Sequence, residues 1–121
     1  MFRRAVVCIV LGGSGIAALE APAAAVTPFD GHWSVVARTT GGKCDPYLGF
    51  QLDVVDGRIL SRQADVSGRV TAAGAVTVTI RGKGSQIDGT GRLYGGSGSG
   101  RWSELSPSGG CRGDWKAKRR A

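Results

Sequence analysis

The chain lacks the residues on which most small active sites depend. Its 121 residues include no asparagine, one histidine and, apart from the initiator, no methionine. No CxxC pair occurs, so a metal site has too few ligands, and we expect neither a metal nor another cofactor. No window shows the i, i+3, i+4 apolar spacing of a helix, which excludes a coiled coil and a dinucleotide-binding domain. The length leaves room for a single domain.

Only the N-terminus carries a long run without charge. Arg3 and Arg4 precede the mostly apolar stretch Ala5–Leu19, and the small residues Ala23–Ala25 follow. A membrane anchor would need roughly 20 apolar residues, and this run is shorter and broken by glycine. The pattern predicts a signal peptide over residues 1–25 that is cleaved after about Ala25. We expect a mature protein in the periplasm or the medium, without a transmembrane segment.

Cleavage at that position would reduce three cysteines to two. Cys8 would leave with the signal peptide, and Cys44 and Cys111 would remain. Two cysteines that reach an oxidising compartment normally pair, so we predict a Cys44–Cys111 disulfide. In the chain-entropy model, a disulfide that closes the loop between Cys44 and Cys111 stabilises the fold by about 4 kcal/mol.

The mature chain alternates apolar and polar residues in short runs separated by glycine. This period of two is typical of half-buried strands, and eight runs of this kind predict an all-β meander, either a barrel or a sandwich. The expected strands are His32–Arg38, Phe50–Val54, Arg58–Arg62, Val66–Thr71, Ala75–Arg81, Gln86–Tyr94, Arg101–Leu105 and Arg112–Lys118.

The cysteine positions favour the barrel. Cys44 follows the first expected strand, and Cys111 precedes the last. A disulfide requires Cα atoms within about 7 Å, which holds if these two strands lie side by side and antiparallel. We therefore predict a closed up-and-down barrel of about eight strands, which also leaves no exposed edge.

Gly-x-Trp occurs three times, and each copy is expected to open a strand. Glycine allows a bend or a close backbone approach at a barrel corner, and tryptophan fills the interior beside it. Core packing is the interpretation we favour, with a tryptophan ligand cage as the alternative. The residues are Gly31 and Trp33, Gly100 and Trp102, and Gly113 and Trp115.

The positive charge is concentrated at the C-terminus. The mature chain would hold 14 basic and 8 acidic residues, a net charge of +6. Four of these charges come from Lys116, Lys118, Arg119 and Arg120, so we predict a barrel domain over residues 26–115 and a basic tail over 116–121. Such a tail is either a solvated terminus or a binding segment. If it binds, we expect an anionic envelope surface or lipopolysaccharide as its partner, and no nucleic acid. Removing it is expected to leave the barrel folded.

Candidate catalytic residues are few. His32 has the outward parity of its strand, and Asp30 is the acid close to it in sequence. A general base such as His32 would need a buried partner to orient it. The second candidate, the carboxylate pair Asp53 and Asp56, flanks a turn and is expected to face solvent. We expect no enzyme activity.

Two further motifs have plain structural explanations. The glycine-dense segment Gly82–Gly100 lacks the Lys-Ser/Thr ending of a phosphate loop, and we interpret it as a hairpin tip. The tripeptide Arg112-Gly113-Asp114 matches an integrin-recognition motif, but recognition requires an exposed loop tip and this copy falls inside an expected strand.

The motifs resemble two groups of exported proteins. The Gly-x-Trp opening with an early cysteine is similar to the calycin barrels, which include lipocalins, avidins and bacterial inhibitors of secreted metalloproteases. The FDGxW start at Phe29–Trp33, the glycine-rich segments Gly89–Leu93 and Gly98–Trp102, and the CxGxW end at Cys111–Trp115 resemble small exported β-barrel proteins of soil and plant-associated proteobacteria. This second resemblance implies fold and export, and no particular activity.

Together these features predict an exported, non-catalytic binding or structural protein. A small inhibitor of secreted proteases is the alternative, and an enzyme comes third. An inhibitor should present an arm or loop that enters a protease cleft, whereas a ligand carrier should have an interior pocket.

Overall fold

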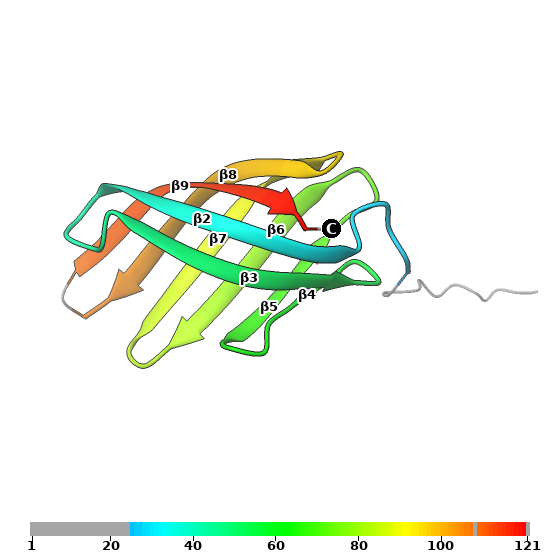
Figure 1. Cartoon of the computed structure of the whole chain (residues 1–121). Coiled ribbons are helices and arrows are strands. Elements are labelled where there is room, and N and C mark those ends of the chain that lie inside the picture. Colours follow the sequence, from blue (N-terminus) through cyan, green and yellow to red (C-terminus); the bar gives the residue numbers. More distant parts are fainter. Residues whose placement is uncertain (1–24, 108, 121) are drawn as a thin grey trace, which may run out of the picture.

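The computed structural model describes residues 25–107 and 109–120, so the expected signal peptide lies outside the described residues except for Ala25. Figure 1 shows the strands closing into one barrel, in which each strand pairs with the next along the chain. The strands are β2 (Gly31–Gly41), β3 (Tyr47–Val55), β4 (Arg58–Leu60), β5 (Asp65–Val70), β6 (Ala75–Gly82), β7 (Ser85–Tyr94), β8 (Ser97–Ser106) and β9 (Gly109–Arg119).

The predicted up-and-down barrel is confirmed. β2 pairs antiparallel with β3 on one side and with β9 on the other, so Val35 lies between Phe50 and Ala117. The predicted disulfide is also present, with 6.1 Å between the Cα atoms of Cys44 and Cys111. The inference from cysteine positions to adjacent first and last strands therefore holds.

Several predicted strand boundaries were wrong. β3 begins at Tyr47 and β8 at Ser97, each at least three residues earlier than expected, while β4 ends at Leu60. The hairpin tip between β7 and β8 is only Gly95-Gly96. Gly98 and Gly100 lie within β8, and they are glycines because backbone and side-chain atoms of the neighbouring strands occupy the space that a Cβ would need.

The barrel does not end at Trp115. β9 continues to Arg119, with Lys116 and Lys118 facing outward and Ala117 buried between them. Residues 116–119 pair with β2 throughout, so the boundary predicted between barrel and basic tail falls inside the last strand. Strand alternation explains this, because a small apolar residue at the inward position allows charged neighbours to remain in solvent.

One end of the barrel is covered by the turn that precedes β2. Phe29 is buried against the core, and its carbonyl accepts a 2.9 Å hydrogen bond from the Trp33 indole N–H. The Asp30 carboxylate accepts backbone N–H bonds from Asp56 (2.7 Å) and Gly57 (3.2 Å) in the β3–β4 turn. Both turn residues have positive φ, as a two-residue hairpin of this twist requires. We call this end the closed end.

Asp30 is held as a carboxylate by these bonds. Burial would raise its pKa, but hydrogen bonds from Thr27, Asp56 and Gly57 outweigh burial and lower the pKa of Asp30 below its ordinary value. Arg119 adds a second connection, because its guanidinium donates to the carbonyls of Asp30 and Pro28 and lies 5.1 Å from the centroid of the Trp33 ring. The aspartate of the FDGxW segment thus joins the N-terminal turn to the β3–β4 hairpin.

The opposite end, which we call the mouth, includes the connections 42–46, 61–64 and 83–84 and the disulfide. Inward side chains are less buried here: Phe50, Ile80, Ile87 and Trp102 are half-buried, and Leu48 is exposed. The buried residues of the core cluster lie nearer the closed end. They are Phe29, Trp33, Val54, Ile59, Val70, Val76, Leu93, Trp115 and Ala117.

The barrel wall has one weakly paired seam. β4 is three residues long and pairs with β5 at Arg58 and Arg69 alone, supported by a 2.7 Å hydrogen bond from Val70 N–H to the Gly57 carbonyl. By comparison, β8 and β9 share ten paired positions. A groove of about 580 Å³ runs along the seam, lined in part by Leu60, Val66 and Gly68.

Candidate binding site

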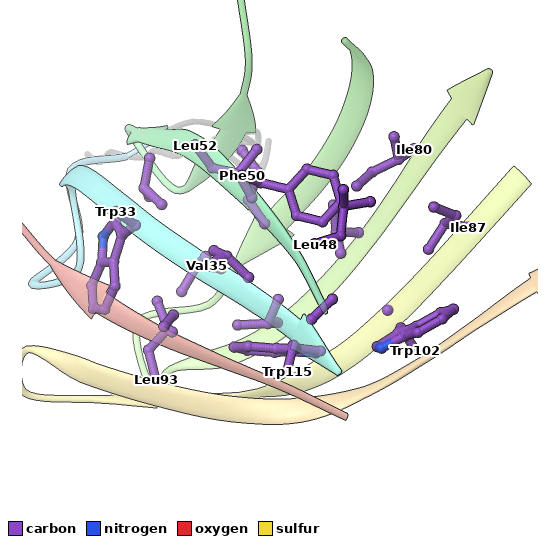
Figure 2. A pocket seen from close by; sticks show the side chains of 18 residues that line it. Trp33, Val35, Leu48, Phe50, Leu52, Ile80, Ile87, Leu93, Trp102 and Trp115 are labelled. Atoms are coloured by element: carbon purple, nitrogen blue, oxygen red, sulfur yellow. The ribbon is translucent and has the colours of Figure 1, made fainter. Parts of the chain in front are cut away.

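The barrel encloses a cavity with an apolar lining. Its volume is about 100 Å³, and no charged or polar side chain is among the residues that line it. Figure 2 shows Trp33 and Leu93 at one end of this lining and Leu48, Ile80, Ile87 and Trp102 toward the other. The full set is Trp33, Val35, Ala37, Leu48, Phe50, Leu52, Val54, Ile59, Val70, Val76, Val78, Ile80, Ile87, Gly89, Leu93, Trp102, Trp115 and Ala117.

All three tryptophans face this cavity, and the barrel itself satisfies their polar atoms. The indole N–H of Trp115 donates to the Thr90 carbonyl (3.1 Å), and that of Trp102 donates to the Asp114 carbonyl (3.1 Å). Trp33 donates to Phe29, as described above. An indole N–H usually finds a partner when buried, and here each partner is main chain. The cavity therefore receives only the hydrocarbon surface of the rings.

Glycines on adjacent strands create the space for these rings. A Cβ added at Gly100 would lie 2.7 Å from Cε2 of Trp115, and one added at Gly113 would lie 2.8 Å from Nε1 of Trp102. The glycine of each of these two Gly-x-Trp copies thus packs under the tryptophan of the other. Our prediction that every copy opens a strand at a barrel corner was wrong for Gly100 and Gly113, which lie inside β8 and β9. Gly31, which opens β2, fits it.

The mouth also holds the one cluster of potential metal ligands among the described residues. Cys44, Glu104 and Cys111 place their ligand atoms within 4.8 Å of one another, and Oε1 of Glu104 lies 3.3 Å from Sγ of Cys44. The two sulfur atoms are bonded to each other, so neither offers the thiolate that a metal requires. In this oxidised state the cluster is a structural bridge at the mouth.

His32 lies on the outer surface of β2, as its parity predicts. Its Nδ1 is 2.5 Å from Oδ1 of Asp53 on β3, so its acidic partner is Asp53 and not Asp30. The imidazole side chain is 74% exposed and faces away from the cavity. Asp53 and Asp56 do not act as a carboxylate pair, because Asp53 contacts His32 while Asp56 occupies the β3–β4 turn.

The tripeptide Arg112-Gly113-Asp114 lies within β9, not at a loop tip. Asp114 forms a two-point contact with Arg38 on β2, at 2.7 and 3.2 Å. The hydrogen bond from Arg38 and its charge lower the pKa of Asp114. Gly113 is buried beneath Trp102. An integrin-type ligand needs the Arg and Asp side chains to be free at a turn, which this arrangement does not provide.

The four basic residues at the C-terminus separate into two groups. Lys116 and Lys118 are exposed on the outer surface of β9, whereas Arg119 is engaged at the closed end with main-chain carbonyls, including that of Gly95 (3.0 Å). Arg120 donates to Oε1 of Gln51 on β3 at 2.9 Å. They do not form one tail.

The sequence analysis missed part of the cavity wall. Leu48 lies on the mouth side of β3 and lines the cavity, but it was expected in a connection because the strand was predicted to begin at Phe50. The alternation of Phe50, Leu52 and Val54 extends back to Leu48, and this signal would have found it. Ile80 and Ile87 were expected to be inward-facing, but nothing in the sequence indicated that space would remain between them.

No protein-family model matches the chain, and a search among curated proteins finds no match either. No helix in the described part of the chain is long and apolar enough to span a membrane.

Proposed function

We propose that this protein is an exported, non-catalytic binding protein that takes an apolar group into its barrel through the mouth. The observation that carries the proposal is the cavity of about 100 Å³ with a lining free of polar side chains. Dry apolar cavities of similar size accept small hydrophobic molecules, since one of about 150 Å³ binds benzene. The cavity fits a ring or a short stretch of alkyl chain.

The difference between the two ends of the barrel favours entry at the mouth. Phe29 and the Asp30 hydrogen bonds cover the closed end, whereas Leu48 at the mouth is 47% exposed and Trp102 is half-buried. A ligand with an apolar chain and a polar head would place the chain inside and leave the head in water at the mouth. Export fits the disulfide, which persists in oxidising compartments. The resemblance to exported proteobacterial barrels points the same way.

Tryptophan fluorescence tests the proposal directly, because all three tryptophans line the cavity. We would titrate the protein with straight-chain fatty acids of increasing length and with a brominated chain that quenches indoles on contact. Affinity should rise by about 0.8 kcal/mol for each buried CH₂ until the cavity is full and then level off. The brominated chain should quench the emission.

Two phenylalanine substitutions on β2 provide a matched pair. Ala37→Phe places a ring in the cavity between Leu48 and Trp115, the strand neighbours of Ala37, and should abolish binding. Val36→Phe adds the same ring on the outer surface, where Val36 is 49% exposed, and should leave binding unchanged. If Ala37→Phe fails to fold, Ile87→Phe is a second variant that fills the cavity near the mouth. The proposal would be contradicted if no fatty acid of any length bound. It would also be contradicted if Ala37→Phe and Val36→Phe bound the fatty acids equally well.

A further inference from the structure

The outer surface of β7, β8 and β9 gathers positive charge from three strands. The strand register places Arg92, Ser99 and Lys116 in one row across the sheet. The next row toward the closed end contains Tyr94, Ser97 and Lys118. Arg101 lies one row toward the mouth, between Thr90 and Asp114. We call Arg92, Tyr94, Ser97, Ser99, Arg101, Lys116 and Lys118 the β7–β9 face.

None of these cations forms an ion pair with a carboxylate in the part of the chain that the structure describes. The described residues form two ion pairs, His32–Asp53 and Arg38–Asp114, so no cation of the β7–β9 face has a carboxylate within 4.0 Å. Asp114, the acid in the Arg101 row, is bound to Arg38, and Lys116 and Arg101 also attract its charge. One carboxylate shared among three cations leaves the face with a net positive charge. Arg92 donates to the Ala73 carbonyl at 3.2 Å, which holds the side chain but leaves its charge uncompensated.

Apolar side chains lie among these charges. Tyr94 is 53% exposed at the edge of the face, with its hydroxyl 3.0 Å from Oγ of Ser99. Val36 of β2, the neighbour of Lys116, is 49% exposed. A soluble polyanion would bind the cations but would gain nothing from contact with these two side chains. A lipid interface suits both, because tyrosine sits at the headgroup level and cations meet anionic phosphates.

We propose that the β7–β9 face docks the protein onto the phosphate headgroups of an anionic lipid bilayer. The proposal does not depend on a ligand in the barrel, because the face lies on the outer wall and the cavity lies inside. It also replaces the predicted basic tail over 116–121, since Lys116 and Lys118 belong to β9 and act together with Arg92 and Arg101 on one sheet.

Co-sedimentation with vesicles tests the docking surface, using phosphatidylglycerol–phosphatidylcholine vesicles against phosphatidylcholine alone. The test variant is Lys116→Glu/Lys118→Glu. The control is Arg58→Glu/Arg69→Glu, which changes the net charge by the same amount at two exposed arginines that pair across β4 and β5. A third variant, Tyr94→Ser, removes the interfacial aromatic ring without changing the charge. Near-ultraviolet circular dichroism of each variant verifies the fold.

We expect the parent protein to bind the anionic vesicles alone and to dissociate as salt rises. The Lys116/Lys118 variant should lose at least about tenfold in partitioning, while the Arg58/Arg69 control keeps most of its binding. Tyr94→Ser should weaken binding by a smaller factor. Equal losses in the two charge variants would show that net charge alone attracts the protein, and the proposal would fail. It would also fail if the protein bound a soluble polyanion such as heparin but no vesicle.

Discussion

At the scale of single residues, glycine and tryptophan act as pairs across strands. Gly100 lies under the ring of Trp115 and Gly113 under the ring of Trp102, so each missing Cβ provides room for an indole. The indole N–H groups then bond to main-chain carbonyls, so the rings present only hydrocarbon surface to the cavity. The hydrophobic lining of the candidate site therefore depends on residues that contribute no side chain.

Gly113→Ala should destabilise the protein strongly. The added methyl group would clash with the Arg38 carbonyl and with Nε1 of Trp102, and overpacking of this kind costs about 1–3 kcal/mol. Gly49→Ala is the matched control, because Gly49 is also in a strand but exposed, and its nearest atom to an added Cβ is 3.9 Å away. Urea denaturation of both variants measures the difference, and equal midpoints would show that the Gly–Trp packing is unimportant.

Asp30→Asn should weaken the barrel at neutral pH and matter less in acid. The folded pKa of Asp30 lies below its ordinary value of 3.8, so the ionised carboxylate stabilises the fold above that pH. This contribution disappears as the pH falls through the folded pKa. Solvent screening limits it to about 1 kcal/mol, since the carboxylate is partly exposed.

Denaturation of the parent and Asp30→Asn proteins at neutral pH and near pH 3 tests this dependence. The gap between their unfolding free energies should shrink in acid. Asp114, whose pKa is also lowered, is present in both proteins and cancels in the comparison. A gap that is constant with pH would mean that the hydrogen bonds to Asp30 do not depend on its charge.

At the scale of elements, the barrel is secured unevenly. The β4–β5 seam has one paired position, while β8–β9 has ten. Local opening follows the number of hydrogen bonds and buried contacts that must be broken. We expect amide hydrogens of β4 and the first half of β5 to exchange faster than those of β8 and β9 by at least about tenfold. Hydrogen-exchange mass spectrometry would measure this, and uniform protection around the barrel would contradict it.

The disulfide secures the opposite side of the barrel, where the β2–β3 connection meets β9. Protein that lacks residues 1–25, and hence Cys8, should show no free thiol when it is denatured without reductant. Cys44→Ser/Cys111→Ser should lower stability by about 4 kcal/mol if the chain-entropy model applies to the 67-residue separation. Thiol titration and thermal unfolding measure the two effects. Two reactive thiols in protein purified without reductant would show that the bridge does not form in the cell.

At the scale of the whole molecule, the last strand completes the barrel. Deleting residues 116–121 would remove buried Ala117 and leave part of β2 without a partner. Contrary to our expectation from sequence, we now expect this truncation to unfold the protein or open its wall, because a broken barrel exposes two strand edges. Loss of the near-ultraviolet circular dichroism signal would demonstrate it. Deleting only Arg120 and Ala121 serves as the control and should preserve the fold.

Strand content and order could be predicted from the sequence because both depend on local patterns. A run such as Val76, Val78, Ile80 alternates with the period of an extended backbone wherever it occurs in the chain. The two cysteines then added one long-range restraint, which was sufficient to favour a closed barrel over a sandwich. The outward position of His32 followed from the same alternation.

The sequence alone thus determined the fold class, the inward and outward faces of most strands, and the bridge between Cys44 and Cys111. Only the tertiary structure decided which end is covered, how large the cavity is, and that Lys116 and Lys118 share a face with Arg92. The physical reason is register. Alternation specifies which side of a strand a residue occupies, but its neighbours on the next strand depend on how closure aligns segments far apart in the chain.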